Sequence, residues 1–495
     1  MLKIKIDGRE IETAEGTTVL AAGLAAGIDI PHFCHHPAFE PEGTCRMCLV
    51  AIEGSAKLEL SCATKVRDGM KVATDTPEVW AARRDVLEFL LAEHPLDCPI
   101  CDKAGECRLQ DYYERHGGFQ GRFRETREKR DKIVPIGRSL LLDNERCILC
   151  TRCVRFLRRI TGTGELGVYQ RGVRTWIGLY EGRKIDNDYS GNLVEICPVG
   201  AITDADFRGR TRTWLLEKGD SICPHCGRGC NITLEFRSGS ERSGEGPRVF
   251  RVRAKENPAV NGHWICDLGR YAYAKGPENR QRRVLMIKEK SATELSWDKA
   301  LIMLSEKVRG LRRAGRGGRV GLILETCLSN EELSLVRRTF GEAVAGRNYW
   351  FADPMPGRAD SLLLTAERTP NLRGARDLGF ELRRPDLDEI SKGADLLLVF
   401  GTALLEHFPE NRVREVLAGV QAKFLFASRA GALDRAVDVI LPTALTAERS
   451  GSVTNVDGRT QEFRPVLKPP GDARSAADIL ADLARALETD KGNGK

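Results

Sequence analysis

The chain has 495 residues, 41% of them hydrophobic, and a formal net charge of +7 at pH 7. This length exceeds what one hydrophobic core supports, so about two to four domains are expected. The basic runs 122–130 and 312–319 are mixed with acids or broken by glycine, which argues for solvated loops and against nucleic-acid binding.

The cysteines point to metal binding. The longest apolar stretch, residues 394–405, is interrupted by Asp395 and Gly401 and is too short to span a bilayer. The N-terminus alternates like a strand and lacks the layout of a secretory signal, so a cytoplasmic location without a transmembrane helix is expected. Disulfides are rare in that compartment, and the chain has 16 cysteines. Metal ligation is therefore the leading explanation for them.

Residues 1–78 are predicted to form a small β-grasp domain. Strands at 2–6 and 10–13 flank an Asp7-Gly8 turn, and a short helix over 17–26 ends at Gly27. The next loop carries the first ligand set, spaced C-x10-C-x2-C-x13-C: Cys34, Cys45, Cys48 and Cys62. A [2Fe–2S] cluster is favoured, with tetrahedral zinc as the alternative. His35 and His36 are interpreted as loop residues.

Residues 79–118 are predicted to form a second metal domain. An amphipathic helix over 78–92 precedes Pro95. The second ligand set, spaced H-x3-C-x2-C-x5-C, consists of His94, Cys98, Cys101 and Cys107. A [4Fe–4S] cluster needs four ligands and only three cysteines are present, so His94 is predicted to supply the fourth. A neutral imidazole in place of a thiolate should raise the cluster potential.

Residues 138–212 are predicted to form a ferredoxin-like domain with one further [4Fe–4S] cluster. The third ligand set is a tight triplet completed by a distant Cys-Pro: Cys147, Cys150, Cys153 and Cys197. A two-cluster ferredoxin would place a fourth cysteine soon after the triplet, where Leu157 and Arg158 stand instead. The triplet with Cys-Pro is much more typical of [4Fe–4S] than of zinc.

Residues 216–272 are predicted to hold a third [4Fe–4S] cluster. The fourth ligand set, spaced C-x2-C-x3-C-x35-C, consists of Cys223, Cys226, Cys230 and Cys266. Gly227 and Gly229 would let the backbone approach the cluster and donate N–H groups to its sulfurs. His225 and His263 are interpreted as loop residues facing solvent, or at most as neighbours of the ligands. Cys327, the one remaining thiol, is interpreted as a small buried hydrophobe.

One motif suggests a nucleotide site but lies in the wrong context. Gly162, Gly164 and Gly167 match G-x-G-x-x-G, yet they follow a basic helix-like run, residues 154–160, rather than a strand. They also lie between ligands of the third set. No NAD or flavin site is therefore expected in this chain.

Residues 273–495 are predicted to form an α/β domain with a mostly parallel sheet covered by helices on both faces. Helices are expected over 297–312, with Ser296 as N-cap, over 329–344 and over 409–417. The expected strands are 319–324, 394–401, 423–427 and 437–441, and residues 352–385 are expected to be irregular.

The ordered ligand sets resemble the large iron–sulfur subunit, the G subunit, of bacterial NADH:quinone oxidoreductase, respiratory complex I. The fourth set resembles the extra cluster of some members, which opens a domain related to molybdopterin oxidoreductases. Segments 329–332 and 447–461 also resemble that domain. The C-terminal region is much shorter than in typical members, and Cys327 precedes the position of the family's metal ligand. The resemblance therefore implies a shortened, structural domain without molybdopterin.

The resemblance implies an iron–sulfur relay that passes electrons from a flavin-containing NADH dehydrogenase partner towards quinone. It implies one [2Fe–2S] and three [4Fe–4S] clusters, no catalytic residue, and peripheral attachment to the inner face of the cell membrane through partner subunits of the translocase. The alternative is an electron-transfer subunit of a soluble NAD-linked formate dehydrogenase or hydrogenase complex. A molybdopterin enzyme and a structural zinc protein are the remaining hypotheses.

Overall fold

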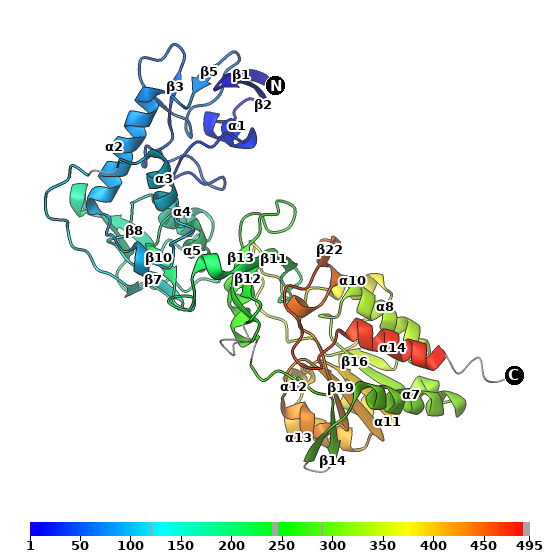
Figure 1. Cartoon of the computed structure of the whole chain (residues 1–495). Helices are drawn as coiled ribbons and strands as arrows, with labels where there is room; N and C mark the ends of the chain where they lie inside the picture. Colours follow the sequence, from blue (N-terminus) through cyan, green and yellow to red (C-terminus); the bar gives the residue numbers. More distant parts are fainter. Residues whose placement is uncertain (119–120, 240–245, 277, 289–290, 489–495) are drawn as a thin grey trace. The chain divides into compact units, whose positions relative to one another are not determined.

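The computed structural model describes residues 1–118, 121–239, 246–276, 278–288 and 291–488. They form two compact units, 1–216 and 217–495 (Figure 1). None of the helices in the described part of the chain combines the length and apolar character that a bilayer crossing needs.

The first unit begins with a five-stranded mixed sheet in the order β2-β1-β5-β3-β4. Its elements are β1 (Leu2–Ile6), β2 (Arg9–Thr13), α1 (Val19–Ala25), β3 (Leu49–Ile52), β4 (Glu59–Leu60) and β5 (Lys71–Ala73). As predicted, β1 and β2 pair antiparallel through a turn in which Asp7 and Gly8 both have positive φ, 49° and 79°. The Thr18 side chain caps α1, and Gly27 follows the helix with φ of 73°. Apolar side chains of α1 and the sheet form one core.

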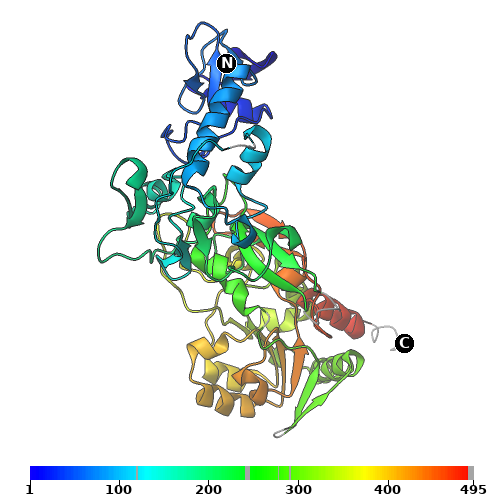
Figure 2. The same cartoon turned by 60° about the vertical axis from the view of Figure 1, so that its left-hand side comes forward.

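Two helices follow, α2 (Pro77–Glu93) and α3 (Arg108–His116), which pack side by side (Figure 2). The short η1 (Cys98–Ile100) lies between them in sequence. The predicted helix over 78–92 is thus confirmed, and it stops where Pro95 approaches.

The rest of the first unit contains short strands around two helices. A sheet in the order β10-β7-β6 and a β8-β9 hairpin accompany α4 and α5. These elements are β6 (Val134–Pro135), β7 (Leu140–Leu142), α4 (Arg152–Arg159), β8 (Leu166–Tyr169), η2 (Gly172–Arg174), β9 (Trp176–Leu179), α5 (Asn192–Ile196), β10 (Ile202–Asp204) and η3 (Thr213–Leu215). The G-x-G-x-x-G segment follows helix α4, as its sequence context predicts, and Gly167 lies within β8.

The second unit opens with an antiparallel sheet that was not predicted from the sequence. It consists of β11 (Glu217–Ile222), β12 (Asn231–Arg237) and β13 (Arg248–Ala254), followed by α6 (Asp267–Tyr271) and η4 (Ala272–Lys275). The connection between β11 and β12 carries three cysteines of the fourth ligand set.

A seven-stranded sheet in the order β15-β14-β20-β19-β18-β16-β17 dominates the second unit. Strands β17, β16, β18, β19 and β20 pair parallel, and β14 and β15 add an antiparallel edge. The strands are β14 (Leu285–Lys288), β15 (Ser291–Glu294), β16 (Val320–Leu324), β17 (Tyr349–Phe351), β18 (Leu396–Phe400), β19 (Ala422–Ala427) and β20 (Val439–Pro442). The mostly parallel sheet is as predicted.

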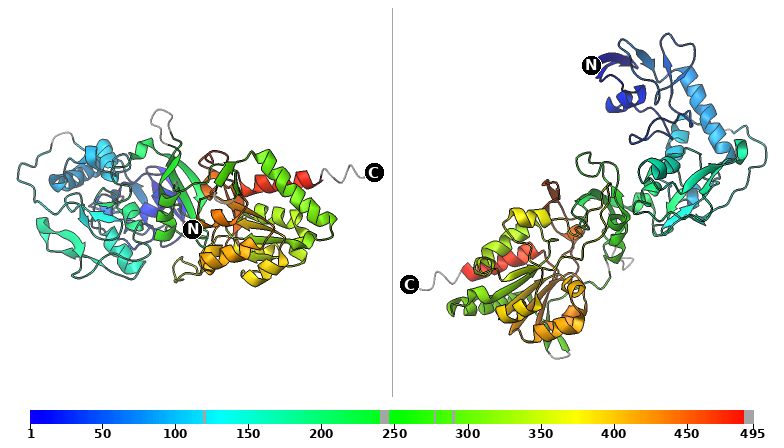
Figure 3. Two further views of the ribbon diagram at one scale, coloured as in Figure 1. Left: turned by 90° about the horizontal axis from the view of Figure 1, so that it is seen from below. Right: turned by 180° about the vertical axis from the view of Figure 1, so that it is seen from behind.

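Helices cover both faces of this sheet (Figure 3). One face packs on α7 (Trp297–Arg313), α8 (Asn330–Thr339) and α14 (Ala476–Glu488), and the other on α11 (Leu387–Gly393) and α13 (Glu410–Ala418). The remaining elements are η5 (Gly317–Arg319), α9 (Gly341–Ala345), α10 (Leu372–Asp377), α12 (Leu404–His407), η6 (Ala432–Ala436), η7 (Thr446–Glu448), β21 (Gly451–Thr454) and β22 (Thr460–Phe463).

Two expectations for this unit need correction. The helix predicted over 329–344 is two helices, α8 and α9, because Phe340 leaves the helical region with φ of −119° and ψ of 39°. The stretch 352–385 is irregular as expected, except that it contains helix α10.

Candidate iron–sulfur sites

The four cysteines of the first ligand set are buried and free of disulfides. The backbone N–H groups of Phe33 and Cys34 both donate to Cys45 Sγ at 3.4 Å. A hydrogen bond with the Cys45 thiol lowers the pKa of Cys34 to about 4, and the same contact raises the pKa of Cys45. A hydrogen bond with Cys62 likewise lowers the pKa of Cys48 to about 7. The loop thus brings its four thiols together in two adjacent pairs.

In the second ligand set, His94 directly follows the last residue of α2, and its imidazole is neutral. Its Nδ1 atom is buried without a hydrogen-bond partner. Burial, and next the positive charge of Arg146, lower the pKa of His94 to about 4, so the imidazole is uncharged at pH 7. His94, Cys98 and Cys107 line one cavity of about 790 Å³, and Cys101 is buried nearby. Neutral imidazole is the form of histidine that binds metals.

The third ligand set encloses a small space. Cys147, Cys150, Cys153 and Cys197 all line one cavity of about 20 Å³, together with apolar side chains. Leu149 and Thr151, between these cysteines, have positive φ values of 53° and 59°, a conformation that non-glycine residues adopt only when the surroundings require it.

Burial makes the thiols of the third set hard to ionise. It raises the pKa of Cys147 to about 12 and that of Cys150 to about 11, with neighbouring thiolates adding to both. Bound iron supplies the positive charge that stabilises such thiolates.

The fourth ligand set lies where the β11–β12 connection meets the start of α6. Its four cysteines are buried, and Cys266 caps α6 by accepting a hydrogen bond from the N–H of Gly269 at 3.5 Å. A Cβ atom on Gly269 would approach Cys223 Sγ to 2.8 Å, so only glycine leaves room there. Gly229 has φ of 59°, which also favours glycine. Burial raises the pKa of Cys266 to about 11.

The donor types fit iron–sulfur clusters. Such clusters are usually held by four cysteine thiolates, and in some of them imidazole replaces thiolate. Every set contains buried cysteines without a disulfide. In the described part of the chain, no three His, Cys, Asp or Glu side chains lie close enough to hold a single metal ion.

Within the first unit, short contacts connect the ligand sets. The N–H of Arg108, next to Cys107, donates to the carbonyl of Pro198 at 3.1 Å, and Pro198 follows Cys197. The Arg108 side chain also reaches His32 Nε2 at 2.9 Å, two residues before Cys34. The second ligand set is thereby linked to both others.

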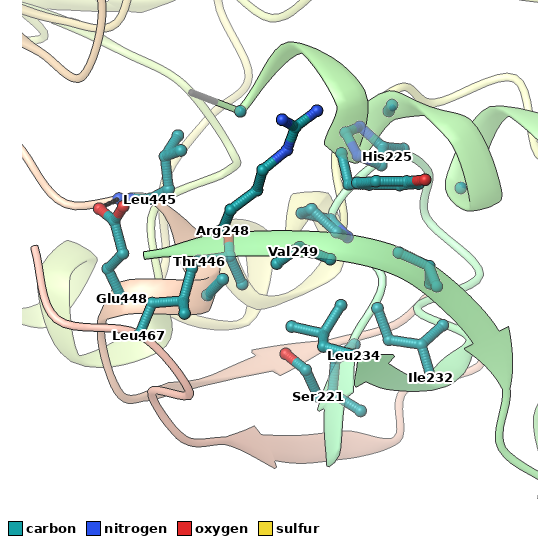
Figure 4. Close-up of a pocket in the computed structure, with 18 of the residues that line it drawn as sticks. Ser221, His225, Ile232, Leu234, Arg248, Val249, Leu445, Thr446, Glu448 and Leu467 are labelled. Carbon is teal, nitrogen blue, oxygen red and sulfur yellow. Dashed lines mark hydrogen bonds between the residues drawn. The ribbon is translucent and has the colours of Figure 1, made fainter. Parts of the chain in front are cut away.

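Two residues differ from their sequence interpretation. His225 does not simply face solvent: burial, and next Arg429, lower its pKa to about 4. Its ring lines a cavity of about 160 Å³, together with Arg248 of strand β13 and residues 445–448 (Figure 4). Cys327 is only partly buried, and its Sγ donates to Glu325 at 3.2 Å. His263 agrees better with its interpretation, because its Nδ1 lies 3.4 Å from the exposed carboxylate of Glu256.

Two functional candidates that were not predicted from the sequence are Arg152 and Arg155. Both residues are 5% exposed, and both donate to backbone carbonyls at or beside the predicted ligands, Arg152 to Ile196 and Arg155 to Cys150. Their neighbours Val154, Phe156 and Leu157 are also buried. These apolar residues among the arginines were the sequence feature that could have indicated a partly buried helix instead of a solvated one.

Comparisons with known proteins agree with this order of sites. Residues 1–77 match a 2Fe-2S iron-sulfur cluster binding domain, and residues 83–120 match the NADH-ubiquinone oxidoreductase-G iron-sulfur binding region. Residues 137–203 match the ferredoxin-like domain of NADH-quinone oxidoreductase subunit 3, and residues 429–486 match molybdopterin oxidoreductase.

Curated relatives carry names that agree with these domains. The NADH-quinone oxidoreductase G subunit of Rickettsia bellii is 38% identical over 350 residues, covering 70% of this chain and 49% of the relative. The Streptomyces coelicolor G subunit is 38% identical, covering 67% and 38%, and subunit 3 of Thermus thermophilus is 38% identical, covering 67% and 45%. A solved chain of an NAD+-reducing [NiFe]-hydrogenase is 33% identical with a TM-score of 0.39, covering 43% of this chain and 91% of that one. The chain spans half or less of the length of these curated relatives. With iron–sulfur domain matches in the same order, it belongs to the family of NADH-quinone oxidoreductase G subunits.

Proposed function

We propose that this chain is the iron–sulfur electron-relay subunit of an NADH:quinone oxidoreductase. It accepts electrons from a flavin-containing NADH dehydrogenase partner and passes them towards quinone. The observation that carries the proposal is the presence of four ligand sets, each with buried, disulfide-free cysteines, three of them within one compact unit. The names of the relatives indicate NADH-quinone oxidoreductase as the complex in which such a relay would act.

The proposed cofactors follow from the ligand sets. The first set, in a β-grasp domain, holds one [2Fe–2S] cluster, and the other three sets each hold one [4Fe–4S] cluster through fifteen cysteines and His94 in all. The clusters carry the electrons, and the chain supplies position, burial and hydrogen bonds that set each potential. The C-terminal α/β domain, in which residues 429–486 match molybdopterin oxidoreductase, has a structural role. Partner subunits attach the chain to the inner face of the membrane.

The test is iron content combined with reduction by NADH. Anaerobically purified chain should contain about fourteen iron atoms, and its EPR signals should appear when NADH and the flavin-bearing partner are both added. Without the partner, NADH should reduce nothing, and no molybdenum, tungsten or flavin should be present. About ten iron atoms would remove one cubane from the proposal. Reduction by formate or hydrogen through a different partner, without quinone-linked turnover, would assign the chain to the alternative class of complex.

A further inference from the structure

Helix α4 buries two arginines between ligand sets. The helix starts in the middle of the third ligand set, and Arg152 and Arg155 are each 5% exposed. Arg158 and Arg159, later on the same helix, are less buried. Burying a guanidinium is costly unless its charge is balanced and its N–H groups are hydrogen-bonded, so the two buried arginines require an explanation.

The hydrogen bonds of Arg155 join the loop of the first set to that of the third. Its Nη2 donates to the carbonyl of Cys34 and, at 3.2 Å, to the carbonyl of Cys150. Its Nη1 donates to the carbonyl of Glu40 at 3.2 Å, and its Nε donates to Thr151 Oγ1 at 3.3 Å. The guanidinium of Arg155 therefore contacts Cys34 of the first set and Cys150 of the third set.

Arg152 repeats this pattern from the preceding turn. Its Nη2 donates to the carbonyl of His35, next to Cys34, and its Nη1 donates to the carbonyl of Ile196 at 3.1 Å, next to Cys197. The two arginines thus connect both ends of the third set to the loop of the first.

Carbonyl oxygens accept most of the hydrogen bonds from Arg155 but do not neutralise its charge. Arg155 forms a long ion pair with Glu42, at 3.8 Å, and that carboxylate is 38% exposed. An iron–sulfur cluster with its thiolates carries net negative charge and gains one further negative charge on reduction. Clusters in the first and third sets would balance the buried guanidinium, and the guanidinium would favour their reduced forms.

We propose that Arg155 is a positioning residue shared by two clusters, which joins the ligand loops of the first and third sets and raises the reduction potentials of both. This inference rests on the proposed function, because it requires clusters in both sets. The planar guanidinium suits the role because it donates to several carbonyls while its charge is permanent.

The test compares three substitutions in the full chain, measured by redox-titrated EPR. Arg155→Gln removes the charge but keeps a donor, Arg155→Lys keeps the charge, and Arg159→Gln makes the same charge change on the less buried side of α4. We expect Arg155→Gln to lower the midpoint potentials of the first and third clusters and to leave those of the second and fourth nearly unchanged. Arg155→Lys and Arg159→Gln should both stay close to the wild type.

Unchanged midpoints in a fully loaded Arg155→Gln protein, or a shift in only one cluster, would overturn the shared role. If that protein takes up no iron, the lysine variant decides: both clusters at near wild-type midpoints support the inference, and displaced midpoints or a missing cluster reject it. Wild-type protein serves as the check on the proposed function. If it lacks the first or third EPR signal, the proposed function fails; if all signals are present and Arg155→Gln shifts none, only this inference fails.

Discussion

His94 differs from the proposed cysteine ligands in the charge that it brings to a cluster. A thiolate adds a negative charge, whereas the buried imidazole is neutral because its pKa is lowered to about 4. A less negative environment stabilises the reduced cluster, so His94 should hold the second cluster at a higher potential than four thiolates would. In this proposal His94 and Arg155 both favour the reduced clusters, His94 because it brings no negative charge and Arg155 because it adds a positive one.

Replacing His94 by cysteine should therefore keep the second cluster and lower its midpoint potential. Redox-titrated EPR measures this directly. The matched control is His116→Cys, which introduces the same thiol on α3, where the histidine ring packs against Trp80 at 4.5 Å between centroids. The control should leave the midpoint in place. An unchanged midpoint in His94→Cys would show that His94 is not a ligand.

At the scale of elements, local sequence signals predicted α2, α7, α13 and the parallel strands β16, β18, β19 and β20, whereas α11, α14 and the parallel edge strand β17 were not predicted. Ser296 caps α7 as expected, because a serine hydroxyl accepts the N–H of Lys299 three residues on. The strands β16 and β18 were visible as continuous apolar runs. Strand β11 was missed because its sequence, EKGDSI, lacks alternation, and its pairing with β12 compensates.

Cysteine spacing leads to a prediction for each ligand set, but it carries no prediction of the contacts between the sets. The bonds from Arg155 to Cys34 and from Arg108 to Pro198 join residues far apart in the chain. Such contacts depend on how the loops pack in three dimensions, and spacing in one sequence carries no information on that packing.

Gly200 illustrates such a contact and gives a prediction. It lies in the loop after Cys197, and a Cβ atom there would overlap Cys101 Sγ. Gly200→Ala should therefore displace Cys101 and remove about four iron atoms, together with the EPR signal of the second cluster. Gly121→Ala is the control, because a Cβ atom on Gly121 has nothing within 4 Å. Full iron content in the Gly200→Ala protein would contradict this interpretation of the loop.

At the scale of the whole molecule, the proposed clusters are divided three to one between the two compact units. The contacts that connect the first three ligand sets all lie within residues 1–216. The shared packing of these loops gives the first unit the means to hold its clusters by itself.

A fragment of residues 1–216 should accordingly bind about ten iron atoms and show the EPR signals of one binuclear and two cubane clusters. The same fragment with Cys147→Ser is the control, and it should lose about four iron atoms, those of the third cluster. If the intact fragment binds little iron while the full chain binds all of its expected iron, the first unit depends on residues 217–495 for cluster assembly.

The raised pKa values of the third set have a consequence for maturation. Burial raises the pKa of Cys147 to about 12 and that of Cys150 to about 11, so both thiols carry their protons near neutral pH before iron arrives. Cluster insertion must then release those protons, and the apparent affinity of the site for its cluster rises with pH.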